Sequence, residues 1–175
     1  MKIKNLIPIT LSLIAGAVYG QSASTSGDYI MLVDPLDEPE FYCFDLAGWG
    51  QSLQLDDPLQ THTCKTRNAA DQMFHFDGNR LKASEYDRCL QVAGSSETTL
   101  PGSAVLVRPC SEDNALQEAR IDDEGKIRLM DPELCLVAGV ESLPASGPSH
   151  MWRTLTVAKC ESADPALSVW QLGMD

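Results

Sequence analysis

Short apolar runs separated by Gly, Pro, Asp and Ser make up the chain from Tyr29 onwards, and few stretches have the spacing of an amphipathic helix. Runs of this kind, bounded by turn residues, are typical of β-strands. The runs expected to form strands are Tyr29–Val33, Tyr42–Leu46, Gln72–Phe76, Arg80–Ala83, Cys89–Val92, Val105–Cys110, Gln117–Ile121, Ile127–Met130, Cys135–Val137, Leu155–Cys160 and Val169–Leu172. Short strands at regular spacing predict an all-β sandwich or barrel.

A repeat organises these strands. Cys89 opens the segment Cys-Leu-Gln-Val-Ala-Gly, and similar segments open 46 residues away on either side, at Cys43 and Cys135. The closing cysteines are Cys64, Cys110 and Cys160. The first two of these are 46 residues apart and the last two are 50 apart, so the third copy carries an insertion. Self-similarity at this period indicates a repeat architecture in which no copy buries its apolar face alone.

Tight turns and apolar residues recur at corresponding places in the three copies. Asp77-Gly78-Asn79 and Asp123-Glu124-Gly125-Lys126 separate the last strand of one copy from the first strand of the next. Glycine there supplies the positive φ that hairpin turns require. Three four-stranded units must close on one another to bury a common apolar centre. The residues expected in that core are Phe74, Ala119 or Ile121, and Trp170.

The N-terminus has the pattern of a secretory signal peptide. Two lysines precede an apolar run from Leu6 to Ala17, and small residues follow at the positions that a signal peptidase reads. We expect cleavage after Gly20, because a membrane span needs about 20 apolar residues and this run is shorter and contains Pro8. The sequence therefore predicts a signal peptide over residues 1–20, a flexible lead-in over 21–28 and a secreted, extracellular domain over 29–175.

Six cysteines in a secreted chain are expected to form disulfides. The repeat favours one bridge per copy, namely Cys43–Cys64, Cys89–Cys110 and Cys135–Cys160. A zinc site needs clustered cysteines or histidines, and the three histidines are scattered, so no metal or other cofactor is expected.

The charge of the chain bears on its partners. Without the two lysines of the signal peptide the chain has 11 basic and 25 acidic residues, a formal charge of −14 instead of −12. That charge argues against nucleic acid and anionic membranes as partners.

Three tandem copies of a Cys-Leu-x-Val-like segment, each followed by a second cysteine, resemble the ricin B-chain type (R-type) lectin domain over residues 29–172. The Gln-x-aromatic pattern that follows the second cysteine in this family is complete in the first copy, at Gln72-Met73-Phe74, and partial in the other two. The resemblance implies a β-trefoil of twelve strands in three lobes, at about residues 29–77, 78–124 and 125–175. It also implies one shallow, metal-independent sugar site per lobe. Such a site uses an aspartate after the leading cysteine, a glutamine and an aromatic before the closing cysteine, and an Asn-Gln pair before the final aromatic.

The first lobe matches this sugar site best. Its residues at the family's positions are Asp45, Gln60, His62, Asp71 and Gln72. His62 replaces the aromatic platform and Asp71 replaces the asparagine. A carboxylate, amides and a flat ring suit a sugar, whose hydroxyls need donors and acceptors and whose C–H face stacks on rings. Trp49 could add a second stacking surface.

The other two lobes depart from the pattern. The second lobe has Gln91 in place of the aspartate and no aromatic at Ala119. The third lobe has Val137 in place of the aspartate and Ser168 in place of the glutamine. We expect the third lobe to be structural only.

The sequence thus predicts a lectin-like protein that binds carbohydrate or glycoprotein glycans through one site. No enzyme activity is expected, because no Ser-His-Asp order, His-Glu-x-x-His motif or Cys-His pattern is present. One alternative is a protein-interaction trefoil, a protease inhibitor or secreted effector, that works through the inserted loop 143–153. Met151 and Trp152 in that loop suit a partner contact or fold back over the barrel. Another alternative is a structural module without sugar binding, since Gln117 keeps the place of Gln72 in a lobe that lost its site.

Overall fold

The computed structural model describes residues 27–95, 98–131, 133–147 and 149–173. The predicted signal peptide and residues 21–26 of the lead-in lie outside this range. The backbone of Asp28 exchanges hydrogen bonds of 2.7 and 2.9 Å with that of Phe74, so the folded part includes two residues of the expected lead-in. In the described part, no helix has both the length and the apolar character to cross a membrane.

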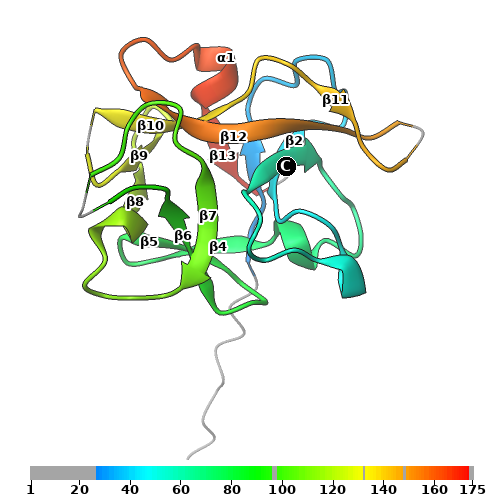
Figure 1. The fold of residues 1–175 in the computed structure, drawn as a ribbon. Helices are drawn as coiled ribbons and strands as arrows, with labels where there is room; N and C mark the ends of the chain where they lie inside the picture. Colours follow the sequence, from blue (N-terminus) through cyan, green and yellow to red (C-terminus); the bar gives the residue numbers. More distant parts are fainter. Residues whose placement is uncertain (1–26, 96–97, 132, 148, 174–175) are drawn as a thin grey trace, which may run out of the picture.

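The chain is an all-β trefoil, as predicted (Figure 1). The first repeat contains β1 (Ile30–Leu32), β2 (Tyr42–Asp45), β3 (Gln60–Thr63) and β4 (Phe74–Asp77). The second contains β5 (Arg80–Ala83), β6 (Arg88–Val92), β7 (Val105–Pro109) and β8 (Ala119–Ile121). The third contains β9 (Ile127–Leu129), β10 (Leu134–Ala138), β11 (Leu143–Pro144), β12 (Met151–Lys159) and β13 (Trp170–Leu172). The short helix α1 (Pro165–Ser168) and the 3-10 turns η1 (Gly50–Ser52), η2 (Ala70–Gln72) and η3 (Ala115–Gln117) complete the described elements.

Each repeat holds one disulfide. The pairs are Cys43–Cys64, Cys89–Cys110 and Cys135–Cys160, which confirms the predicted pairing. Each bridge ties the second strand of its repeat to the residue that directly follows β3, β7 or β12.

Two sheets result from the pairing. One has the order β13-β1-β2-β3-β12-β10-β9-β8, with β11 added to β12, and the other has the order β4-β5-β6-β7. The pairing of β3 with β12 joins the first repeat directly to the third. In Figure 1, β12 is the long orange strand that spans the upper side of the molecule.

The core is centred on aromatic rings from different strands. Phe44 contacts Phe74 and Trp170 edge to face, with centroid distances of 6.0 and 4.7 Å. The Trp170 indole N–H donates to the carbonyl of Leu136 at 3.1 Å, so its polar edge is satisfied inside the core. Phe74, Ala119 and Trp170 are buried as predicted, whereas Ile121 is only partly buried.

Two glycine turns fix the junctions between repeats. Gly78 and Gly125 have φ of 61° and 79°, as expected for hairpin turns. A Cβ on Gly125 would lie 2.8 Å from the carbonyl oxygen of Trp170, so a side chain would also clash there. The predicted fourth strands begin two residues late, at Phe74 and Ala119, because Gln72 and Gln117 each end a 3-10 turn.

Candidate functional site

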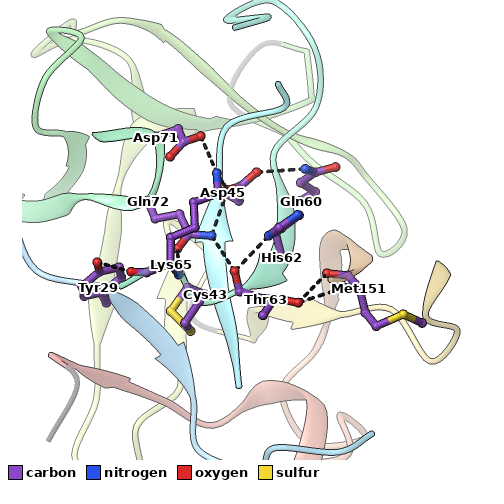
Figure 2. A network of polar contacts seen from close by, with 11 residues as sticks. Tyr29, Cys43, Asp45, Gln60, His62, Thr63, Lys65, Asp71, Gln72 and Met151 are labelled. Carbon is purple, nitrogen blue, oxygen red and sulfur yellow. Dashed lines mark hydrogen bonds and ion pairs between the residues drawn. A yellow bond between two sulfur atoms is a disulfide. The ribbon is translucent and has the colours of Figure 1, made fainter. Parts of the chain in front are cut away.

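The five predicted site residues of the first lobe lie together (Figure 2). Asp45 at the end of β2 is the cross-strand partner of Gln60 at the start of β3, and His62 lies two residues further along β3. Asp71 and Gln72 come from η2. The side chain of Gln72 donates to Asp45 at 2.9 Å, which brings η2 onto the β2–β3 hairpin.

The carboxylate of Asp45 is the centre of this network. Asp45 is 1% exposed. One carboxylate oxygen accepts from the Gln60 amide at 2.9 Å, and the other accepts from Gln72 at 2.9 Å and from the Lys65 ammonium at 3.0 Å. These bonds satisfy the buried charge, as a carboxylate in the interior requires.

Lys65 is the site residue that the sequence interpretation missed. Its ammonium lies between two carboxylates, 3.0 Å from Asp45 and 2.5 Å from Asp71. Burial lowers the pKa of Lys65, but the charges and hydrogen bonds of Asp45 and Asp71 outweigh it, so the net shift raises the pKa and Lys65 stays charged. A usable signal existed: two acidic candidates in one site need a cation, and a lysine follows the closing cysteine of this repeat alone.

Asp71 is less well satisfied. It is 3% exposed, and within the described residues its Oδ1 atom has no hydrogen-bond partner. Burial raises the pKa of Asp71, the hydrogen bond from Lys65 lowers it, and the charge of Asp45 raises it; the net effect is a raised pKa. The ionised form of Asp71 therefore costs folding free energy despite its ion pair.

We expect Asp71→Asn to stabilise the protein at pH 7, because burial raises the pKa of Asp71 and the ionised carboxylate is therefore disfavoured in the folded state. A folded-state pKa above the unfolded value gives stability that is complete below the unfolded pKa and declines as pH rises through the folded pKa. The gain should therefore disappear near pH 4, where the natural carboxyl binds its proton. Urea unfolding at both pH values measures this, and a loss of stability at pH 7 would show that the ion pair with Lys65 dominates.

Gln72 has a structural role that the second repeat duplicates. Its amide oxygen accepts from the N–H of Lys65 at 2.8 Å, and its amide nitrogen donates to the carbonyl of Thr63 at 3.1 Å. Gln117 makes the same two bonds around the closing cysteine of the second repeat, at 2.9 and 3.0 Å. Gln72 thus holds the chain on both sides of Cys64, whatever else it does.

A groove of about 520 Å³ lies over this network. His62 and Lys65 face it from the first repeat, with Trp49 at its edge; we call it the first-lobe groove. Its lining consists of Glu40, Trp49, His62, Cys64, Lys65, Thr66, Arg67, Asn68, Ser146 and His150. Asp45, Gln60, Asp71 and Gln72 do not line it, and Lys65 connects the groove to the carboxylates of Asp45 and Asp71.

The two rings differ in exposure. Trp49 is 65% exposed, whereas His62 is 8% exposed. The Nδ1 atom of His62 lies 2.9 Å from the carbonyl of Thr63, which can only accept, so Nδ1 carries a proton, and in the neutral ring Nε2 is an acceptor. The groove therefore offers an exposed indole surface and an imidazole acceptor beside a lysine ammonium.

The inserted loop of the third repeat folds back onto the first lobe. Residues of β11 pair with the start of β12, and β12 pairs with β3. Ser146 and His150, near the tip of this hairpin, line the first-lobe groove. The sequence interpretation left this loop open between a partner contact and a return onto the barrel, and the structure shows the return.

The place of Asp45 carries no charge in either of the other lobes. Gln91 in the second repeat accepts from Asn114 at 2.9 Å and from Gln117 at 3.1 Å, so an amide network replaces the carboxylate network. Val137 in the third repeat has no polar side-chain atom.

By sequence, no protein-family model and no curated protein matches the chain. Solved structures do match. The C-half of an earthworm R-type lectin, in complex with GalNAc, has a TM-score of 0.58 at 12% identity and covers 86% of this chain and 99% of its own. The β-trefoil lectin of the Vibrio vulnificus hemolysin/cytolysin, with N-acetyl-D-lactosamine bound, has a TM-score of 0.55 at 15% identity, covering 86% and 96%. The mdaA-1 domain has a TM-score of 0.60 at 15% identity, covering 92% and 98%. The chain therefore has the β-trefoil fold that R-type lectins have.

Proposed function

We propose that this chain is a secreted carbohydrate-binding protein that takes a glycan in the first-lobe groove. The observation that carries the proposal is the coincidence of a buried carboxylate network with an exposed tryptophan and a histidine acceptor, which among the described residues occurs in the first lobe alone. Similar structures solved with GalNAc, 6′-sialyllactose and N-acetyl-D-lactosamine support the class of ligand. Three disulfides and the signal-peptide pattern support an oxidising, extracellular location.

In this proposal Asp45 is the hydroxyl acceptor, with Gln60 and Gln72 as its amide partners. A ligand hydroxyl enters from the groove, where Lys65 is the lining residue bonded to Asp45 at 3.0 Å, so it reaches Asp45 beside the Lys65 ammonium, while Gln72 stays held by two further bonds. The Lys65 ammonium has three N–H donors, and two point at carboxylates, which leaves one for a sugar oxygen.

The rings supply the apolar part of recognition. A sugar presents a C–H face that packs on an aromatic surface, and the indole of Trp49 is the largest such surface at the groove. His62 adds a ring edge and an acceptor at Nε2. Catalysis is not proposed, because Asp45 and Asp71 share one lysine instead of facing a bond from two sides as glycosidase carboxylates do.

A glycan array with the mature protein tests the proposal. We expect Trp49→Ala to weaken binding by about fivefold, in line with the ~0.5–1.5 kcal/mol of an aromatic contact. Its stability should change by less than about 0.5 kcal/mol, because the side chain is mostly exposed. Asp45→Asn should weaken binding by more than about tenfold, since hydrogen bonds to charged groups are worth about 1.5–3 kcal/mol.

Gln91→Ala is the matched control, because Gln91 has the place of Asp45 in the second repeat. It should leave glycan binding unchanged. The sugar site would be refuted if the natural protein gave no glycan signal, or if the Trp49 and Asp45 variants gave the same signal as the natural protein. Either result would favour a structural or protein-binding role.

A further inference from the structure

The first-lobe groove has a second wall that comes from a different repeat. The third repeat is longer than the others between its cysteines, 25 residues against 21, and the extra length forms the β11–β12 hairpin. Its pairs are Leu143 with Trp152 and Pro144 with Met151. We name this segment, residues 143–152, the third-repeat hairpin.

Backbone pairing fixes the base of the third-repeat hairpin to the first lobe. In the register of β12 with β3, Trp152 faces His62 and Thr154 faces Gln60. The Met151 N–H donates to the hydroxyl of Thr63 at 2.8 Å, and that hydroxyl donates to Glu38 at 2.7 Å. Figure 2 shows Met151 against Thr63, beside His62.

Arg153, just after the hairpin, strengthens this attachment. Arg153 is 5% exposed, and its guanidinium donates to the carbonyl of Gly139 at 2.8 Å, to that of Val140 at 2.5 Å and to Asp37 at 2.5 Å. The guanidinium also lies 4.9 Å from the centre of the Tyr42 ring. Hydrogen bonds from Ser142, Arg153 and Tyr42 hold the pKa of Asp37 well below its usual range, so the ion pair persists in mild acid. The hairpin is therefore a fixed part of the groove.

The tip of the hairpin completes the groove. The His150 ring contacts the His62 ring edge to face, with 5.4 Å between centroids. The carbonyl of His150 accepts from the N–H of Ala145 at 2.8 Å, which closes the tip. Ser146 beside it is exposed and lines the groove.

Two separate ring surfaces thus border one groove. Trp49 belongs to the first repeat, and the His62–His150 pair joins the first repeat to the third. One sugar ring covers one such surface, and the groove volume of about 520 Å³ lies in the usual range of about 300–1,000 Å³ for whole small-molecule ligands. We infer that the third-repeat hairpin makes this groove selective for glycans of at least two sugar units, with His150 and Ser146 contacting the second unit. This inference rests on the proposed function.

The test uses an array that carries each terminal sugar both alone and at the end of a di- or trisaccharide. The mature natural protein should prefer the extended members by about fivefold or more, the size expected for one further ring contact. His150→Ala should abolish that preference and change binding of the single sugars by less than twofold. His75→Ala is the matched control, because His75 is a partly buried histidine bonded to Ser84 outside the groove, and it should change neither.

Ser146→Trp provides a second test that does not depend on the histidine pair. Its bulk should block the extended glycans and spare the single sugars, with thermal unfolding confirming that the fold is intact. Binding of single sugars without any preference for extended ones, or equal weakening of both kinds in these variants, would overturn the inference while leaving the proposed function in place. Absence of binding to either kind would overturn both.

Discussion

Reduction of the three disulfides is expected to unfold the protein at 37 °C. Two bridges close loops with a sequence separation of 21 residues and the third one of 25. Loops of this length restrict the unfolded chain enough to stabilise the native state by about 3 kcal/mol each. Three such terms, about 9 kcal/mol together, are comparable with the whole stability of a small domain, about 5–15 kcal/mol.

Circular dichroism of the reduced and alkylated protein measures this effect. Single-pair variants divide it: Cys89→Ala with Cys110→Ala and Cys135→Ala with Cys160→Ala should cost nearly the same, because the entropy of loop closure grows only with the logarithm of loop length. An unchanged melting temperature after complete reduction would show that the apolar core alone holds the trefoil.

Replacing Lys65 by methionine is expected to destabilise the protein by about 3–5 kcal/mol at pH 7, the usual cost of leaving a buried charge without its partner. Within the described residues, Lys65 is the basic side chain that contacts both Asp45 and Asp71. Without it, Asp71 would lose the hydrogen bond and charge that lower its pKa, while burial would still raise that pKa, so the variant should recover stability as pH falls towards 4. Urea unfolding between pH 4 and 7 measures the difference.

Lys82→Met is the control for the Lys65 variant. Lys82 also lies 2.5 Å from an aspartate, but its partner Asp87 is 89% exposed, and such a surface pair contributes at most about 1 kcal/mol. Adding Asp71→Asn to Lys65→Met should restore part of the loss. Equal effects of the Lys65 and Lys82 variants would mean that the buried network adds nothing to stability.

Much of the fold could be predicted because the repeat is visible in patterns of residues close together in the sequence. Matched cysteines, short apolar runs and the Asp-Gly and Glu-Gly turns are each visible within a few residues, and three copies confirm one another. The sequence pattern placed the start of the fourth strand of the first repeat at Gln72, two residues too early. The side chain of Gln72 instead hydrogen-bonds the backbone of Thr63 and Lys65, on either side of Cys64.

The site was harder to predict because it depends on contacts between distant residues. The resemblance brought Asp45 and Gln60 together across a hairpin, a short-range relation. Nothing local indicates that β12 pairs with β3, about 90 residues away, or that His150 reaches His62. Lys65 was overlooked because only the burial of both carboxylates makes a neighbouring cation necessary.

The nine-residue strand β12 contributes both to its own repeat and to the first, since it pairs with β10 along one part and with β3 along the other. The groove therefore needs residues from two repeats, although the fold itself consists of three similar units. A symmetric trefoil engineered from three copies of residues 29–77 would carry the Asp45–Lys65 network three times. It would lack the second wall of the groove, because the third-repeat hairpin would be absent. Such a protein would retain the symmetry that gene triplication creates and lose the asymmetry that gives this chain one distinctive surface.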